Sequence, residues 1–216
     1  MYIAIEGVIG VGKTTLARLL QPLLEAQLLL EVFEENPFLS DFYSDRARYA
    51  FQTQIFFLIS RYHQQRRSVP AVLETGNSLI SDYTFTKDSL FADINLYGDE
   101  LEMYYRVHEA LAEKIPNPDL IVYLRADTDF LMQRIAMRDR PYERQMEKSY
   151  VDALNHAYDN YFLKDSFHSI PILVVDSSHL DFLRNTDHLH WVEMRVRQII
   201  QMVPFQPELP LADKEV

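Results

Sequence analysis

The sequence predicts an α/β fold in which helices flank a five-stranded parallel sheet. Short apolar runs alternate with longer segments of helical periodicity, which is the pattern of strands joined by helical crossovers. The apolar runs are mostly unbroken, as in strands that helices cover on both faces. We expect strands at 2–5, 28–33, 78–81, 120–124 and 172–175.

Helical spacing fills the segments between these runs, and the length fits a single domain over residues 1–216. The segments 46–67 and 85–114 are long for such a fold, which makes them candidates for a substrate wall or a dimer face. The proline-rich residues 203–216 are expected to form a tail or a packing arm. The expected helices are roughly 13–26, 46–67, 85–114, 127–137, 146–164 and 187–202.

The composition excludes several classes of function. A formal net charge of −11 argues against a broad nucleic-acid surface, because such a surface needs a basic face. The chain contains no cysteine, so disulfides, thiolate catalysis and cysteine zinc sites are excluded. Neither an apolar membrane span nor a basic-then-apolar signal pattern occurs. We expect a cytoplasmic protein that binds neither nucleic acid nor membrane.

The stretch GVIGVGKTT at residues 7–15 predicts a phosphate-binding loop. It fits the pattern G-x-x-x-x-G-K-[ST] without departure, and it lies between an apolar strand and a helical pattern. In such a loop the N–H groups surround phosphate oxygens, the lysine reaches the β- and γ-phosphates, and the threonine ligates Mg²⁺. We therefore expect ATP and Mg²⁺ as ligands. The expected phosphate-binding residues are Gly7, Gly10, Gly12, Lys13, Thr14 and Thr15.

Asp82 follows the apolar run 78–81, at the carboxyl edge where open α/β sheets bind ligands. A carboxylate there can hold Mg²⁺ directly or through water, or it can cap the next helix. The chain lacks the D-x-x-G and N-K-x-D motifs of regulatory GTPases and the Asp-Glu strand end of motor ATPases. These absences favour a small-molecule kinase.

The segment RIAMRDRPYER predicts an arginine-rich lid at about 137–146. Phosphoryl transfer spreads negative charge over the γ-phosphoryl oxygens, and clustered guanidinium groups stabilise that charge. Arg134 and Arg138 are four residues apart and share one helical face. The cluster consists of Arg134, Arg138, Arg140 and Arg144.

A catalytic base is expected in LLLEVFEENPF, where the second strand ends. Glu31 falls at the carboxyl edge of the sheet and faces the same crevice as the phosphate loop. A carboxylate there can accept a hydroxyl proton as the phosphoryl group arrives. Glu34 and Glu35 lie just beyond it and remain alternatives.

Five stretches occur in order along about residues 1–182: GVIGVGKTT, LLLEVFEENPFL, FYSDRARYAFQTQIFFLISRY, SDYTFTKDSLFA and RIAMRDRPYERQMEKSYVDAL. Together they resemble the deoxynucleoside kinases, and most closely the bacterial deoxyadenosine and deoxyguanosine kinase branch. The resemblance implies the P-loop kinase fold, ATP-dependent phosphorylation of the 5′-hydroxyl of a deoxyribonucleoside, and a homodimer.

The resemblance also implies a role for each matching residue. Glu31 stands where the family's E-P-V glutamate acts as general base toward the 5′-hydroxyl. Tyr43 and Glu143 match the residues that hold the 3′-hydroxyl of the sugar. Asp181 and Phe182 match the loop that closes over the adenine of the donor. The residues that match the lid arginines are Arg134, Arg138 and Arg140.

By the same resemblance, the base of the nucleoside lies against Gln54, Arg61 and Asp88. Gln54 is preferred to Gln52 because it keeps the family's spacing of eleven residues after Tyr43 and seven before Arg61. An aspartate accepts hydrogen bonds from the N–H donors of adenine, guanine and cytosine, whereas a thymine carbonyl repels it. We expect a purine deoxynucleoside, and deoxycytidine stays open.

Two departures from the family pattern stand out. The E-P-V stretch is Glu31-Val32-Phe33, which lacks the proline. The usual acidic-Arg-Ser stretch is Asp82-Tyr83-Thr84, which lacks an arginine often aimed at the 5′-oxygen. We expect Lys87 or a lid arginine to supply the positive charge of the missing arginine.

Two other functions remain open. A nucleoside monophosphate kinase of the thymidylate kinase type shares the phosphate loop and the arginine-rich lid, although its D-R-x pattern is Asp82-Tyr83 here. A non-catalytic nucleotide-binding subunit would have no use for a base at Glu31.

Overall fold

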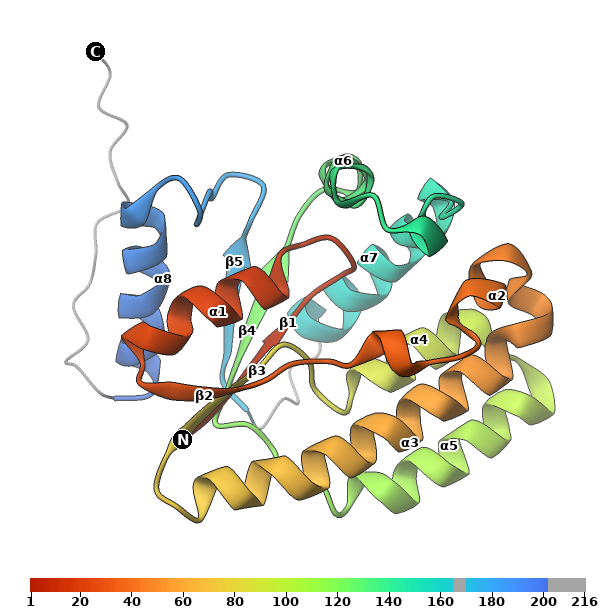
Figure 1. Cartoon of the computed structure of the whole chain (residues 1–216), viewed down its shortest axis with the longest axis horizontal. Coiled ribbons are helices and arrows are strands. Elements are labelled where there is room, and N and C mark those ends of the chain that lie inside the picture. The colour runs from red at the N-terminus through yellow and green to blue at the C-terminus, as the bar shows by residue number, and fades with distance from the viewer. Residues whose placement is uncertain (165–169, 202–216) are drawn as a thin grey trace.

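A parallel sheet of five strands, in the order β2-β3-β1-β4-β5, forms the centre of the molecule (Figure 1). The structure is a computed structural model and describes residues 1–164 and 170–201. The expected α/β fold and the parallel sheet are confirmed. The strands are β1 (Tyr2–Glu6), β2 (Ala26–Leu29), β3 (Ser78–Ser81), β4 (Leu120–Arg125) and β5 (Ile172–Asp176).

Helices cover both faces of this sheet (Figure 1). α1 (Lys13–Leu23) and α8 (Thr186–Ile199) pack together on one face. α3 (Arg46–Leu73) and α7 (Lys148–Lys164) lie on the other face, with α4 (Lys87–Asn95) between them. The side chains at 2–5 in β1 are buried, as their unbroken apolar run predicts, and Glu6 at the end of the strand is buried as well. The remaining helices are α2 (Leu39–Ser44), α5 (Gly98–Ala112) and α6 (Thr128–Arg138).

The carboxyl ends of β1 and β3 meet at the centre of the sheet, where β1 pairs with β3 on one side and β4 on the other. Ala4 of β1 is paired with Ser81 of β3, so the phosphate loop after β1 lies next to Asp82. A crevice at such a switch in strand order is the usual ligand site of open α/β sheets.

Three sequence expectations about element bounds are wrong. The helix expected at 46–67 continues to Leu73. The strand expected at 28–33 ends at Leu29, because its neighbour β3 ends at Ser81 and leaves no partner beyond that pair. The helix expected at 85–114 is two helices, because Leu96 and Tyr97 have extended backbone and Gly98 has a φ of 58°. The expected tail at 203–216 lies outside the described residues.

Helix length and hydropathy bear on membrane insertion. Within residues 1–164 and 170–201, no helix combines the length and the apolar character that crossing a membrane requires.

Candidate functional site

The phosphate loop connects β1 to α1 at the carboxyl edge of the sheet. Gly12 has a left-handed φ of 106° and caps α1, whose first N–H groups give the helix N-terminus a positive potential. The Lys13 ammonium donates to the carbonyl oxygens of Gly7 at 2.6 Å and Val8 at 3.2 Å, so it lies across the loop. Burial, followed by repulsion from Lys87, lowers the pKa of Lys13 to about 8.

Gly7 is a position of this loop where a side chain has no room. Its φ is 143°, and an added Cβ would lie 2.3 Å from the carbonyl oxygen of Leu124 in β4. Gly76 also has a positive φ, of 77°, but no atom lies within 4 Å of an added Cβ. It is therefore a control that separates backbone strain from steric overlap.

We expect Gly76→Ala to lower the free energy of unfolding by about 1–2 kcal/mol through backbone strain alone. Gly7→Ala is expected to cost about 1–3 kcal/mol more, because the new methyl group overlaps a backbone atom of the sheet. Urea denaturation of both variants measures the difference. Equal losses would contradict the close packing of the loop against β4.

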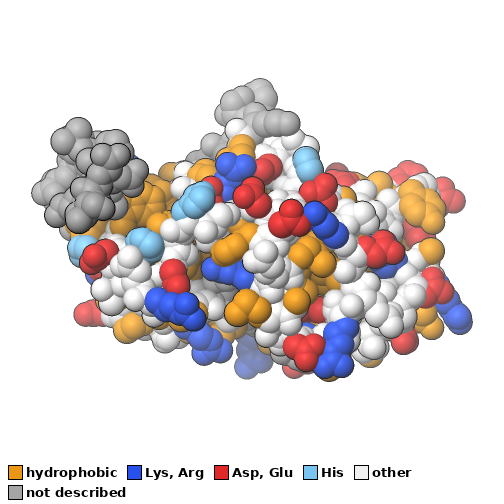
Figure 2. Space-filling model, turned by 90° about the horizontal axis from the view of Figure 1, so that it is seen from above, with side chains coloured by type: hydrophobic (Ala, Val, Ile, Leu, Met, Phe, Trp, Pro, Cys, Tyr) orange, Lys and Arg blue, Asp and Glu red, His pale blue; other side chains and the backbone are white. Residues whose placement is uncertain are grey.

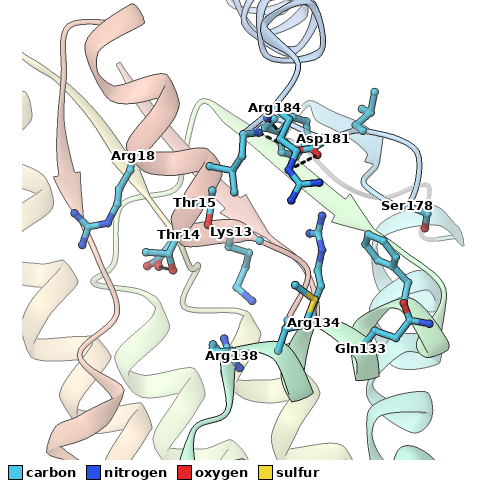
Figure 3. A pocket seen from close by; sticks show the side chains of 18 of the residues that line it. Lys13, Thr14, Thr15, Arg18, Gln133, Arg134, Arg138, Ser178, Asp181 and Arg184 are labelled. Atoms are coloured by element: carbon cyan, nitrogen blue, oxygen red, sulfur yellow. Dashed lines mark hydrogen bonds and ion pairs between the residues drawn. The ribbon is translucent and has the colours of Figure 1, made fainter.

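A cleft of about 980 Å³ opens above the phosphate loop, a size typical of small-molecule sites. Figure 3 shows side chains of α1, α6 and the loop after β5 converging on it. Seen from above, this face is hollowed near its centre, and Lys and Arg side chains lie in and around the hollow (Figure 2). Such a positively charged hollow fits a polyphosphate. The lining residues include Gly10, Gly12, Lys13, Thr14, Thr15, Arg134, Arg138 and Arg140.

Asp82 links the phosphate loop to the segment that carries Glu31. Its Oδ2 accepts a hydrogen bond from Thr14 Oγ1 at 2.5 Å, and its Oδ1 accepts one from the Glu31 N–H at 2.8 Å. The two residues expected to bind metal, Thr14 and Asp82, are therefore adjacent. A hydroxyl and a carboxylate oxygen are hard ligands of the kind that Mg²⁺ prefers.

Glu31 lies just past β2, and two cations hold its carboxylate. Arg61 of α3 donates to Oε1, and Lys87 of α4 donates to Oε2 at 2.5 Å. Burial alone would raise the pKa of Glu31, but Arg61 and Lys87 outweigh it and hold the pKa well below its usual range. Glu31 is therefore ionised at neutral pH. Of the alternatives, Glu35 is exposed, and the side chain of Glu34 lies outside the described part of the structure.

The same Arg61 also binds Asp88, so one guanidinium bridges two carboxylates. Arg61 Nη1 donates to Asp88 Oδ1, and Asp88 is fully buried. Asp88 Oδ2 has no hydrogen-bond partner among the described residues. Gln54 is also buried and lies two helical turns before Arg61, on the same face of α3. Gln54 and Arg61 thus share a buried face of α3, and Arg61 connects this face to Asp88 and Glu31.

Tyr43 and Glu143, which are far apart in the sequence, lie in one cluster. The Tyr43 ring stacks on Tyr142 with centroids 6.0 Å apart. Burial, followed by the neighbouring Tyr150 and Glu143, raises the pKa of Tyr43 well above its usual value. Glu143 is buried, and its Oε1 accepts a hydrogen bond from Arg138 Nη2 at 2.7 Å. The pair expected to hold the sugar is therefore brought together.

Three of the expected lid arginines line the cleft, each with its own contacts. Arg134 Nη1 donates to the Val11 carbonyl oxygen at 2.8 Å, which places its guanidinium against the phosphate loop. Arg138 follows one turn later and binds the carboxylate described above. The Arg140 guanidinium lies 4.0 Å from the centre of the Phe33 ring. The three cations thus line one cleft together with the phosphate loop.

Asp181 and Phe182 belong to the loop after β5 and line the same cleft. Asp181 Oδ1 accepts hydrogen bonds from two N–H groups of the following turn, at 3.0 and 3.1 Å. Phe182 is 7% exposed and also packs into the core. Arg144, by contrast, pairs with Asp139 on the surface and is not among the cleft residues.

A buried carboxylate under the site was not predicted. Glu6 is fully buried at the end of β1, and its Oε1 accepts hydrogen bonds from the Thr84 N–H at 2.5 Å and the Thr84 hydroxyl at 2.7 Å. Burial raises the pKa of Glu6 against the opposing effect of Lys87 and Lys13. The sequence did contain a signal for this buried carboxylate, because Glu6 follows the apolar run 2–5 and directly precedes the phosphate loop.

Tyr83, where the resemblance led us to look for an arginine, is turned into the protein. It is fully buried in a cluster with Leu29 and Val69. Its hydroxyl donates to Gln64 Oε1 at 2.5 Å, and Gln64 Nε2 donates to the Leu30 carbonyl oxygen at 2.8 Å. Tyr83 therefore supports the backbone that leads to Glu31 instead of bringing charge to the cleft.

The chain is similar along most of its length to nucleoside kinases. It is 34% identical over 201 residues to the deoxyguanosine kinase of Bacillus subtilis (strain 168), covering 92% of this chain and 97% of the relative. It is 28% identical over 206 residues to the deoxyadenosine/deoxycytidine kinase of the same organism, covering 92% of each.

The fold gives the same result. The structure of a deoxyadenosine kinase from M. mycoides, with the products dCMP and a flexible dCDP bound, matches with a TM-score of 0.80 and 25% sequence identity. That match covers 92% of this chain and 100% of the other. The family model described as deoxynucleoside kinase matches residues 3–201, which span the phosphate loop, the Glu31 segment and the arginine-rich turn. This chain therefore belongs to the deoxynucleoside kinase family, whose members are phosphate-transferring enzymes.

Proposed function

We propose that this enzyme transfers the γ-phosphoryl group of ATP to the 5′-hydroxyl of a purine deoxyribonucleoside. The observation that carries the proposal is the position of Glu31. Its backbone N–H donates a hydrogen bond to Asp82, beside the phosphate loop. Its carboxylate accepts a hydrogen bond from Arg61, and Arg61 also donates to Asp88. One carboxylate thus joins a cleft suited to a polyphosphate to the buried polar groups of Arg61 and Asp88.

In this mechanism Glu31 is the general base. It accepts the proton of the 5′-hydroxyl while the bond from the 5′-oxygen to the γ-phosphorus forms. The bond from the γ-phosphorus to the β,γ-bridging oxygen breaks at the same time, and its electron pair leaves with ADP. Arg134, Arg138 and Arg140 stabilise the charge that develops on the phosphoryl oxygens.

The donor is proposed to occupy the cleft above the phosphate loop, with Lys13 on its phosphates and Asp181 and Phe182 beside its adenine. Thr14 and Asp82 would hold Mg²⁺, which neutralises phosphate charge when bound. Within residues 1–164 and 170–201, no three acidic, histidine or cysteine side chains cluster closely enough to form a metal cage. This donor set fits Mg²⁺, which commonly takes several of its ligands from phosphate and water.

The preference for a purine rests on the resemblance to the deoxyadenosine and deoxyguanosine kinase branch. Asp88 separates adenine, guanine and cytosine from thymine. Its free Oδ2 is a buried acceptor, and leaving it unpaired costs about 1–3 kcal/mol, so a base that donates an N–H group is favoured over one that presents a carbonyl. Gln54 offers one donor and one acceptor beside it, which suits a base edge. The similar B. subtilis proteins are named for deoxyguanosine and for deoxyadenosine or deoxycytidine, which supports a purine and leaves deoxycytidine open. Tyr43 and Glu143 are proposed to bind the 3′-hydroxyl.

The proposal is tested by the position of the new phosphate. Incubation with ATP labelled in its γ-phosphate and deoxyadenosine or deoxyguanosine should give the labelled 5′-monophosphate. The matched 2′,5′-dideoxynucleoside lacks only the acceptor oxygen, so it should compete for binding and receive no label. Label on any other oxygen, or transfer only to a monophosphate, would overturn the proposal.

The pKa of Lys13 predicts how donor binding depends on pH. Below about pH 8 the ammonium is charged in the free enzyme, and bound phosphates raise its pKa further. Above about pH 8 binding therefore takes up a proton, and the affinity for ATP falls as the pH rises. Calorimetry at pH 8.5 in buffers of different ionisation enthalpy measures the uptake. Lys13→Arg keeps its charge and should remove this pH dependence, and its persistence in that variant would contradict the assignment.

We also propose that residues 137–146 form a lid on a single domain. The two ends of this segment are held by α6 and α7, while two of its arginines, Arg138 and Arg140, line the cleft. Limited proteolysis should slow within 137–146 when nucleoside and a non-hydrolysable ATP analogue are bound. Equal cleavage rates would contradict closure.

A homodimer remains a proposal that rests on the family resemblance. Ile59 of α3 and Met103 of α5 are large apolar side chains with 42% and 50% of their surface exposed. Sedimentation of the chain at micromolar concentration should give a dimer, whereas a monomer at all concentrations would contradict it.

A further inference from the structure

Lys87 is the first residue of α4 and is placed deep in the site. It is 6% exposed, although a lysine is seldom buried without a function or a partner. Glu31 Oε2, at 2.5 Å, is the hydrogen-bond acceptor that the described residues provide for its ammonium. Glu31 donates its N–H to Asp82, which also accepts from Thr14, so Lys87 is connected to the phosphate loop through Glu31 and Asp82.

The two oxygens of Glu31 are both occupied, Oε1 by Arg61 and Oε2 by Lys87. Each oxygen keeps a second lone pair that can accept a hydrogen bond from a 5′-hydroxyl, but a carboxylate held by two cations is a weak base. Movement of one cation away from its oxygen when the nucleoside binds would therefore make Glu31 a stronger base.

Lys87 is the cation that is free to leave. The planar guanidinium of Arg61 is fixed by its second carboxylate, Asp88, and by the Phe57 ring 4.5 Å away. Lys87 has one acceptor among the described residues, and its ammonium sits on a flexible four-carbon stem. A small rotation of that stem would release Oε2 and keep the ammonium within reach of the oxygen that replaces it.

We propose that Lys87 is a catalytic residue: the 5′-hydroxyl displaces its ammonium from Glu31 Oε2, and the ammonium then binds the 5′-oxygen and the transferred phosphoryl group. This inference rests on the proposed function. The bonds formed and broken are those of the phosphoryl transfer itself. The hydroxyl proton goes to Glu31, and Lys87 keeps its own protons throughout and donates hydrogen bonds.

The charges around the phosphate loop support this role. Lys13 and Lys87 repel each other, and that repulsion contributes to the low pKa of Lys13. The buried Glu6 interacts with both lysines and offsets part of this repulsion. A phosphoryl group that arrives between the two ammonium groups would replace their repulsion by attraction, and charge gained in the transition state would strengthen it.

Because the chain contains no cysteine, the ammonium can be removed and restored chemically. Lys87→Cys should lower kcat by about 10²–10³-fold, with a smaller change in the KM for the nucleoside. Alkylation of the unfolded variant with 2-bromoethylamine and refolding gives S-aminoethylcysteine, a lysine analogue, which should recover at least about tenfold in kcat. Alkylation with iodoacetamide places a neutral group there and should recover nothing.

Lys114→Cys, at an exposed lysine after α5, is the control for the alkylation and refolding steps and should match the wild type. Lys87→Arg and Lys87→Met need no modification. The arginine variant keeps a cation and should be more active than the methionine variant. Equal activity of the two, or no recovery after aminoethylation when the Lys114 control recovers, would overturn the proposal.

A double variant separates direct action from positioning. If Lys87 contacts the phosphoryl group, adding Lys87→Met to Glu31→Gln should lower kcat by about a further tenfold or more. A loss of this kind is expected when one hydrogen-bond donor to the transition-state oxygens is removed. No further loss would mean that Lys87 acts only through Glu31, and would overturn the proposal. Failure of the wild type to phosphorylate any deoxynucleoside is a different result, since it contradicts the proposed function itself.

Discussion

Glu31→Gln is expected to lower kcat by about 10²–10⁴-fold, the range that a general base contributes. The amide keeps the shape of the carboxylate but cannot take the proton of the 5′-hydroxyl at neutral pH. The Kd for ATP should change little, because the Glu31 side chain contacts Arg61 and Lys87, whereas Lys13 lies on the loop carbonyls. Steady-state kinetics and calorimetric titration with ATP measure the two quantities separately.

Glu35→Gln is the matched control, because Glu35 lies in the same short segment but is exposed. Its kcat should equal that of the wild type. Thermal unfolding of both variants is needed, since Glu31→Gln leaves Lys87 without its carboxylate partner and can lower stability. Undiminished turnover in Glu31→Gln would assign proton transfer to another group.

Asp88→Ala is expected to weaken base discrimination more than it lowers the rate with the preferred nucleoside. The free Oδ2 of Asp88 is the acceptor that we assign to a purine N–H group, and a thymine carbonyl facing it would be repelled. Removing the carboxylate should reduce the ratio of kcat/KM between the preferred purine and thymidine by on the order of 10²-fold. The ratio is measured with each nucleoside as the sole acceptor.

Asp93→Ala is the control for this variant. Asp93 lies on the same helix, α4, but is exposed and binds Tyr105 outside the site. Its selectivity should be unchanged. A uniform loss across all bases in Asp88→Ala would show that Asp88 serves only to hold Arg61, with no part in reading the base.

The sheet could be predicted because each strand carries its own signal. The run at 78–81 was placed at its observed bounds, and the phosphate loop followed from a motif confined to a few neighbouring residues. The end of β2 could not be placed in this way. The segment 30–33 is apolar enough for a strand, but the length of a strand also depends on its neighbour, and β3 ends first.

The break between α4 and α5 did have a local signal. Gly98 is followed by Asp99 and Glu100, which is typical of a new helix N-terminus. The helical periodicity across residues 85–114 nevertheless led to the prediction of one continuous helix.

The ion pairs of the site could not be derived from sequence periodicity. Glu31, Arg61 and Lys87 come from a loop and two helices, and their contacts depend on how α3 and α4 pack against the sheet. Gln54 and Asp88 were located through the family resemblance, because a buried polar residue on a long helix looks like an exposed one in the sequence. The resemblance assigned no role to Glu6, so its place under the site was not predicted.

The most direct test of the function is the set of kcat/KM values with MgATP for deoxyadenosine, deoxyguanosine, deoxycytidine, thymidine, dAMP and dTMP, each as the sole acceptor. We expect a purine deoxynucleoside to give the highest value, thymidine to give the lowest value among the nucleosides, and the two monophosphates to give none. Turnover with a monophosphate alone would identify a nucleoside monophosphate kinase. ATP binding without turnover of any acceptor would identify a nucleotide-binding subunit. Either result would contradict the assignment of Glu31 as the base that activates a 5′-hydroxyl.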